Sequence, residues 1–445
     1  MENKSIKQPE TTGQAVPVKV RLADPKKKKM SKAKKIVLIV LGVVILVVLG
    51  VALRYILAYN GFLDKVTDRT PEKKQYSVVV ENDSGYNEIN DLNNKSAGFL
   101  KTDPKVSNAE QVLQSVVKVE VDNYDDIDTM TSALKGKITD AIVLETDRLE
   151  MLKEEVENIE KNTKVIYTFE IELDSETAET ANKEITKEPF VVYISGSDSR
   201  TGIKATARSD VNIIAVVNPG KGKILLVSIP RDTYVQLHGT TGIKDKLTHA
   251  GVYGIEMSKA TIEDFLGIKI DYTIKVSFDT VVKVVDQLDG IDIVSDQAMT
   301  LKTGGKTCEF IEGKQHVDGD CALRFARERK SYATGDRHRG ENQQQVITSI
   351  IGRLADSKDY LLKIPTILDI AADSFETTFS RDNVSSFIRR QLTDPIKWQV
   401  ESIAVDGTGT YEPTYSMGAN RPLYVMIPLD ASVTNAINKI NEYLQ

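Results

Sequence analysis

Residues 190–232 read FVVYISGSDSRTGIKATARSDVNIIAVVNPGKGKILLVSIPRD and decide the fold of the chain. The apolar runs at 190–194, 211–217 and 223–229 are rich in Val and Ile, and each has the length of a buried strand. The segment NPGKG at 218–222 is a tight-turn signal, so the second and third runs are expected to pair antiparallel. The stretch therefore predicts three consecutive strands of one sheet.

Charged residues stand at the ends of these three runs. If neighbouring strands pair antiparallel, the end of the first, the start of the second and the end of the third lie at one edge of the sheet. Loops in solvent also carry charges, so this edge alone favours a functional site only slightly. The charged residues expected at the edge are Asp198, Arg200, Arg208, Asp210, Arg231 and Asp232.

A second arginine-rich segment lies downstream, with ALRFARER at 322–329 and GDRHRGENQQ at 335–344. From Asp336, a candidate N-cap, the pattern becomes helical. One stripe of this helix carries Arg339 and Gln343 and continues as an apolar face. Burying polar groups without partners is costly, so these two side chains either pair with acids as structural ties or line a site. The apolar part of the stripe is Val346, Ile347, Ile350 and Leu354.

The arginines and aspartates of these segments suit a phosphorylated ligand. A guanidinium group binds phosphate oxygens bidentately and keeps its charge. Carboxylates beside phosphate oxygens are ligands for Mg²⁺, and arginines with a metal stabilise the charge of a phosphoryl group in transfer. No Ser-His-Asp arrangement or Walker loop is evident, and the two Cys and four scattered His form no zinc pattern. The sequence favours phosphotransfer.

The two cysteines, Cys308 and Cys321, leave two alternatives open. They would form a disulfide in an oxidising compartment, or they are two unpaired thiols. Spacing does not decide between these alternatives.

Residues 76–186 are expected to form a separate small α/β unit. It shows no nucleophile, metal cluster or glycine-rich loop, which favours a spacer or interaction module. The pattern predicts strands at 76–81, 141–144 and 165–173 and helices at 125–134 and 147–161.

The net charge of −6 over 445 residues hides a basic N-terminus. Residues 1–35, a predicted cytoplasmic tail, carry eleven Lys or Arg against three acids. An apolar run follows, so 36–59 are expected to be a single membrane-spanning helix, with 60–75 as a stalk. The preceding lysines predict a cell-membrane protein whose remainder is extracytoplasmic. A cleavable signal peptide is the alternative, but the long tail and the lack of a small-residue cleavage site argue against it.

These segments, in this order after a predicted span, resemble the LytR–CpsA–Psr family of cell-wall glycopolymer transferases. The resemblance implies an α/β fold at 187–445, an α-β-α sandwich with a central mixed sheet. It also implies the accessory domain of the capsule-associated branch at 76–186. Asn342 stands where many members have arginine, which fits that branch better than the teichoic-acid branch, although its members often carry more spans. The motifs that carry the resemblance are GSDSR (196–200), RSD (208–210), SIPRD (228–232), KLTHA (246–250), ALRFARER (322–329) and GDRHRGENQQ (335–344).

The resemblance implies a phosphotransferase assisted by Mg²⁺ that moves a glycan from a polyprenyl-pyrophosphate carrier onto peptidoglycan outside the membrane. Asp198 and Asp210 look like the metal-side carboxylates. Gln343 looks like the glutamine beside the pyrophosphate clamp, and Asp336 like the group that orients a clamp arginine. The clamp arginines are Arg208, Arg231, Arg327, Arg329 and Arg339. The expected catalytic residues are Arg208, Asp210, Arg231, Asp336 and Arg339.

Two other functions would use the same features. A pyrophosphatase for polyprenyl carriers would use the same residues with water as the nucleophile. A transmembrane regulator of capsule or cell-wall genes would bind nucleic acid through its lysine-rich tail. That tail has no helix-turn-helix and no interleaved aromatic residues, so no specific nucleic acid is expected as a partner. The phosphotransferase acting on capsular polysaccharide or a related wall polymer is the main prediction.

Overall fold

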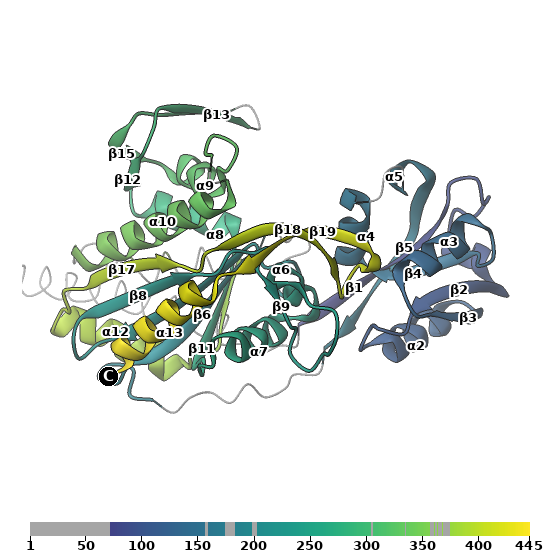
Figure 1. Cartoon of the computed structure of the whole chain (residues 1–445), viewed down its shortest axis with the longest axis horizontal. Coiled ribbons are helices and arrows are strands. Elements are labelled where there is room, and N and C mark those ends of the chain that lie inside the picture. Colours follow the sequence, from purple (N-terminus) through teal and green to yellow (C-terminus); the bar gives the residue numbers. More distant parts are fainter. Residues whose placement is uncertain are drawn as a thin grey trace, which may run out of the picture. The chain divides into compact units, whose positions relative to one another are not determined.

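The computed structural model describes residues 72–155, 159–173, 183–197, 203–303, 306–333, 335–356, 360, 363, 367 and 374–445. They belong to one compact unit that extends from Ile56 to Gln445. The two largest sheets of the described chain have five and six strands, and each packs against helices (Figure 1). Whether the chain divides into separate domains at 186/187 stays a prediction.

The N-terminal part of the described chain, named here the accessory region, is built on the five-stranded sheet with the order β3-β2-β4-β1-β5. Val78 and Val80 pack with α2 on one face of this sheet, whereas Val79 packs with α3 and α4 on the other. The predicted strands and the predicted helix at 125–134 are present, and two helices, α4 and α5, lie where one was predicted at 147–161. β2, α2 and β3 were not predicted. The elements are β1 (Lys73–Glu81), η1 (Ile89–Leu92), β2 (Lys95–Leu100), α2 (Val106–Val116), β3 (Val119–Tyr124), α3 (Ile127–Lys135), β4 (Ala141–Glu145), α4 (Thr146–Glu155), α5 (Ile159–Asn162) and β5 (Thr163–Glu172).

The six-stranded central sheet has the order β16-β11-β6-β7-β8-β17. β6, β7 and β8 pair antiparallel in chain order, as the sequence predicts. β11 pairs parallel with β6 and β17 pairs parallel with β8, so the sheet is mixed. The turn between β7 and β8 needs Gly222, because its φ is 63° and a Cβ would lie 2.8 Å from the Lys397 carbonyl oxygen. The strands are β6 (Phe190–Ser197), β7 (Val211–Asn218), β8 (Lys223–Ser228), β11 (Tyr272–Ser277), β16 (Phe375–Thr377) and β17 (Gln399–Ala404).

Helices cover both faces of the central sheet (Figure 1). Val191 and Tyr193 of β6 pack with α7 and α13 on one face. Phe190 and Val192 pack with α8, α10 and α12 on the other. This layering is the α-β-α arrangement that was expected. The helices that follow β8 are α6 (Leu247–Ala250), η2 (Gly251–Tyr253), α7 (Ile255–Leu266), α8 (Phe278–Gln287), α9 (Gly319–Arg327), α10 (Asp336–Asp356), α12 (Arg381–Thr393) and α13 (Asp430–Leu444).

A disulfide joins Cys308 in β14 to Cys321 in α9, with sulfur atoms 2.02 Å apart. Of the two alternatives that the sequence leaves open, the structure has the paired cysteines. The bond ties α9, which ends at Arg327, to two short antiparallel strand pairs, β12 with β15 and β13 with β14. Their strands are β12 (Ile291–Ser295), β13 (Met299–Thr303), β14 (Lys306–Phe310) and β15 (Gly313–Val317).

A long hairpin of β18 and β19 links the central sheet to the accessory region. Near one end, the Met426 N–H donates to the Asp232 carbonyl oxygen over 2.8 Å. Near the other end, Leu423 is buried among residues of the accessory region, and Arg421 forms an ion pair with Asp128 of α3. The short strands β9 and β10 lie against the hairpin. The bounds are β9 (Tyr234–Val235), β10 (Asp245–Lys246), β18 (Gly407–Thr414) and β19 (Gly418–Pro428).

The predicted membrane span at 36–59 lies outside the described residues, as does the tail at 1–35. Within the described part of the chain, no helix is long and apolar enough to cross a bilayer. The anchor and its orientation therefore stay predictions.

The double variant Cys308→Ser/Cys321→Ser tests what the disulfide contributes. Opening a loop of this size costs about 3 kcal/mol, so we expect amide hydrogen exchange in β14 and α9 to accelerate roughly 100-fold. Hydrogen exchange with mass spectrometry measures this. Dithiothreitol is expected to reproduce the effect in the natural protein and to change nothing in the double variant. Equal exchange in both proteins would contradict a stabilising role.

Candidate active site

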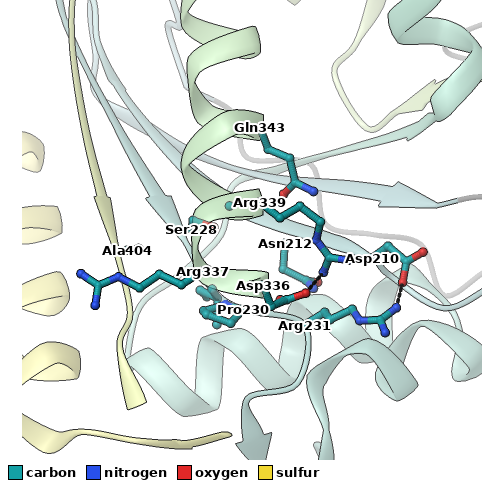
Figure 2. Close-up of a pocket in the computed structure, with 12 residues that line it drawn as sticks. Asp210, Asn212, Ser228, Pro230, Arg231, Asp336, Arg337, Arg339, Gln343 and Ala404 are labelled. Carbon is teal, nitrogen blue, oxygen red and sulfur yellow. Dashed lines mark hydrogen bonds and ion pairs between the residues drawn. The ribbon is translucent and has the colours of Figure 1, made fainter. Parts of the chain in front are cut away.

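Charged side chains from three segments converge on one pocket at the end of the central sheet (Figure 2). Asp210 precedes β7 and Arg231 follows β8, while α10 begins at Asp336 and carries Arg339 and Gln343. The sequence proposed these five as site residues, and the structure brings them together. The other residues that line the pocket are Asn212, Ser228, Ile229, Pro230, Arg337, Gly340 and Ala404.

Two ion pairs hold the inner arginines of the pocket, as the dashed lines in Figure 2 show. Arg231 Nη1 lies 2.8 Å from Asp210 Oδ1, and Arg339 Nη2 lies 2.6 Å from Asp336 Oδ1. The four side chains are only 11% to 25% exposed. Arg231 Nε is buried and has no hydrogen-bond partner among the described residues. The guanidinium groups are thus oriented by carboxylates and still have donors to offer a ligand.

The positive charge of Arg231 acts against that of Arg339, which lines the same pocket. Burial lowers the pKa of Arg339, Asp336 opposes this, and the charge of Arg231 adds to the lowering. Burial also works against the charge of Arg231, but Asp210 and Asp232 outweigh it and raise its pKa. An anion between the two groups would relieve the repulsion and accept charge-assisted hydrogen bonds from both. The pocket therefore favours a multiply charged anion.

The start of α10 lies directly on the end of β8. A Cβ on Gly340 would lie 2.9 Å from Ser228 Oγ, so a larger residue would push the helix away from the sheet. Gln344 Nε2 donates to the carbonyl oxygens of Leu226 at 3.1 Å and Ile403 at 2.7 Å, which ties the helix to β8 and β17. This close approach brings the first turns of α10 over the loop that follows β8.

The segment KLTHA fixes the loop that carries Arg231. The Thr248 N–H donates to the Arg231 carbonyl oxygen over 2.9 Å. Lys246 Nζ lies 3.3 Å from Asp232 Oδ1, on the carboxylate next to Arg231. The sequence listed these residues only as part of a motif and did not propose Lys246 for the site. Its position within KLTHA was the available signal.

Arg208 lies outside the pocket lining and binds a carboxylate of the accessory region. Its two terminal nitrogens donate to the two oxygens of Glu154 in α4, over 2.7 Å and 2.8 Å. The hydrogen bonds from Arg208 hold the pKa of Glu154 below its ordinary value, and the charges of Arg231 and Lys246 contribute. Glu154 thus sits within reach of three cations near the pocket, where a phosphate would also bind.

Arg327 and Arg329 are exposed and do not line the pocket. The Arg327 guanidinium lies over the Phe278 ring, 4.6 Å from its centroid. Burial raises the pKa of Asp336, and the positive charges of Arg339 and Arg329 offset part of this rise. The two arginines predicted for the clamp from ALRFARER therefore lie at the periphery of the site.

Asn342 faces away from the pocket. It is buried, and its Nδ2 donates to the Phe325 carbonyl oxygen of α9 over 3.0 Å. Asn342 thus forms a structural tie between α10 and α9. Gln343, the next residue, is the one that lines the pocket.

Two carboxylates were proposed as metal ligands, Asp198 and Asp210. Asp198 lies outside the described residues, and Asp210 lies within them. Arg231 contacts Asp210 Oδ1, which leaves Oδ2 without a hydrogen bond from a described residue. The described part of the chain holds no group of three or more His, Cys, Asp or Glu side chains arranged for a metal. The Gly196 carbonyl, two residues before Asp198, accepts from the Asp210 N–H over 2.8 Å. A hard cation here would need ligands from Asp198 and from a bound phosphate.

Comparison with known proteins gives one family match. Residues 150–426 match the model of the LytR_cpsA_psr family. The polyisoprenyl-teichoic acid–peptidoglycan teichoic acid transferase TagU of Bacillus anthracis is 31% identical over 273 residues, which cover 61% of this chain and 84% of that protein. TagU of Bacillus subtilis is 35% identical over 199 residues, covering 44% and 62%. B. subtilis TagV, known from a crystal structure, is 28% identical in sequence. The match covers 58% of this chain and 98% of the TagV chain, with a TM-score of 0.49.

The variant Glu154→Gln tests whether the accessory region competes with an anion for Arg208. The neutral amide binds the guanidinium more weakly, so we expect the affinity for inorganic pyrophosphate to rise about threefold to fivefold, equivalent to about 1 kcal/mol. Isothermal titration calorimetry of the full-length protein measures this. Glu150→Gln on the same helix, where Glu150 pairs with Lys153, is the matched control. An affinity that is equal in both variants would rule out the competition.

Proposed function

The chain belongs to the LytR_cpsA_psr family, and we propose that it attaches a polyprenyl-pyrophosphate-linked glycopolymer to peptidoglycan. The observation that carries this proposal is the pair of guanidinium groups, Arg231 and Arg339, which line one pocket and are each oriented by a carboxylate. A pyrophosphate is an anion with enough charge and oxygen atoms to engage both. The curated relatives named above, which transfer teichoic acid to peptidoglycan, support a transferase.

The donor is held by its phosphates. Arg231 and Arg339 bind the pyrophosphate oxygens from two sides, and Gln343 offers an amide N–H on the same wall of the pocket. Arg208 joins them when the phosphate displaces Glu154 from its guanidinium. Because arginine binds phosphate bidentately, these contacts also fix the direction in which the phosphorus faces the acceptor.

The transfer is a displacement at phosphorus. A hydroxyl oxygen of the acceptor sugar forms a bond to the phosphorus that bears the glycopolymer, and the bond from that phosphorus to the bridging oxygen breaks. Polyprenyl phosphate leaves with the bridging oxygen, and the hydroxyl proton passes to a carboxylate, for which Asp210 and Asp198 are the candidates. Arg231 and Arg339 stabilise the charge that moves onto the bridging and equatorial oxygens.

We propose Mg²⁺ as the cofactor, held by Asp210 and Asp198 together with phosphate oxygens. Among the described residues, only Arg231 donates to the Asp210 carboxylate, through Oδ1, which supports a role for Oδ2 as a ligand. When bound, the ion would neutralise part of the negative charge of the phosphates. Asp210 would then bridge the ion and Arg231, so its side chain is the link between the cation and the arginine pair.

The substrate and location follow as further proposals. The glycopolymer is capsular polysaccharide or a related wall polymer, which the accessory region before the sandwich supports. The span at 36–59 would hold the protein in the cell membrane and present the pocket outside, where polyprenyl-linked glycans and peptidoglycan meet. The partners are the lipid-linked donor, the peptidoglycan acceptor and the membrane.

The variants Arg231→Ala and Arg231→Lys test the assignment of the site. Removing a charge donor of this kind typically costs about 100-fold or more in rate, so we expect Arg231→Ala to lose transfer to that extent. Arg231→Lys restores the charge but not the bidentate geometry, so it should recover only part of the rate. The assay is transfer of a labelled glycan from polyprenyl pyrophosphate to peptidoglycan by the full-length protein.

Arg390→Ala is the control, because Arg390 pairs with Asp394 on the exposed surface of α12. It should transfer at the natural rate. Unchanged transfer by Arg231→Ala would contradict the site. Release of the glycan phosphate that needs no acceptor would instead identify a pyrophosphatase.

A further inference from the structure

Two tyrosines form an exposed aromatic pair on the β18–β19 hairpin. Tyr411 and Tyr424 stand directly opposite each other on the two strands, and their rings are 6.0 Å apart at an angle of 77°. The two side chains are 69% and 46% exposed, among the most exposed large apolar residues of the described chain. Two exposed aromatic rings side by side offer a surface on which a ligand with an apolar face can pack.

Gly409 of β18 makes room for one of these rings. A Cβ on Gly409 would lie 2.6 Å from the Tyr424 hydroxyl oxygen, so this ring lies across the backbone of β18 at a position where only glycine fits. Gly409 stands opposite Met426, two residues further along β19 than Tyr424. The Tyr424 ring therefore leans along the hairpin toward Met426, and the Tyr411 ring stands nearly perpendicular to it. The two rings together are named here the tyrosine platform.

The tyrosine platform continues into the wall of the pocket. Met426 donates its N–H to the carbonyl oxygen of Asp232, the residue after Arg231. On the other strand, Asp406 precedes β18 and accepts from Arg337 of the pocket lining over 2.8 Å. Both strands are therefore fastened to the site, β19 two residues from Tyr424 and β18 through the residue that precedes it.

The electrostatic environment of Tyr424 agrees with this placement. Burial raises the pKa of the Tyr424 hydroxyl, and the charges of Asp232 and Asp336 raise it further. Its hydroxyl group therefore stays protonated and available as a donor close to the carboxylates of the pocket.

We infer that the tyrosine platform binds the acceptor glycan strand and leads its attacking hydroxyl to the pocket. This inference rests on the proposed function, because it assigns the platform to the acceptor of that reaction. A sugar ring offers a flat face of C–H groups that packs on an aromatic ring, and hydroxyls that bond to a tyrosine hydroxyl at the ring edge. Arginines hold the donor by its charged phosphates. A neutral saccharide has no charge for them to pair with and needs another surface.

The direct test is binding of chito-hexaose, a neutral chain of N-acetylglucosamine, to the full-length protein. We expect the double variant Tyr411→Ala/Tyr424→Ala to bind it at least about tenfold more weakly than the natural protein, and Tyr411→Phe/Tyr424→Phe to retain most of the affinity. Ile311→Ala removes another exposed apolar side chain, 59% exposed in the natural protein, and is the matched control. Unaltered thermal unfolding of the alanine variant checks that the hairpin is intact.

Equal binding by the natural protein and the alanine variant would overturn the inference, as would no binding by the natural protein. This measurement needs no transferase activity, so it separates failure of the platform from failure of the proposed function. The transfer assay then distinguishes acceptor from donor. We expect the alanine variant to raise the KM for the acceptor about tenfold and to leave the affinity for the lipid-linked donor unchanged. The reverse pattern would contradict assignment to the acceptor.

Discussion

Two arginines that line one pocket, each paired with its own carboxylate, are the feature on which the site depends. The guanidinium groups of Arg231 and Arg339 are both positively charged. Asp210 keeps Arg231 in place, and Asp336 keeps Arg339 in place. The carboxylates orient both guanidinium groups before a ligand binds, and an anion between the arginines would accept charge-assisted hydrogen bonds from both. This preorganisation suits the pyrophosphate of the proposed donor.

The fold maintains this arrangement by pressing one helix onto the end of one sheet. Gly340 permits contact between α10 and Ser228, and Gln344 bonds to two neighbouring strands, so the first turns of α10 cannot drift from the loop of Arg231. The β18–β19 hairpin and the accessory region add contacts from outside. Glu154 reaches Arg208, and the tyrosine platform borders the pocket. Donor, acceptor and accessory region thus meet at one end of the sheet.

The sequence predicts much of this and fails where contacts cross between elements. Continuous apolar runs and a tight turn were sufficient for β6, β7 and β8, and antiparallel pairing then brings Asp210 and Arg231 to one edge. Helical periodicity placed Arg339 and Gln343 on one face of α10. It did not predict the contacts of Gln344, because α10 packs against the sheet, α9 and β12 and not against a single surface. The pairing of Arg208 with Glu154 depends on how the accessory region docks, which no local pattern contains. The elements β2, α2 and β3 were not predicted, although α2 carries Val106, Ala109, Leu113 and Val116 at helical spacing.

The position of a bound polyprenyl pyrophosphate tests the central claim most directly. A crystal structure of the protein with this ligand measures it. We predict pyrophosphate density between the guanidinium groups of Arg231 and Arg339, with Asp210 and Asp336 still paired to those arginines. Pyrophosphate bound instead at the peripheral Arg327 and Arg329, with the space between Arg231 and Arg339 filled by water, would contradict the claim.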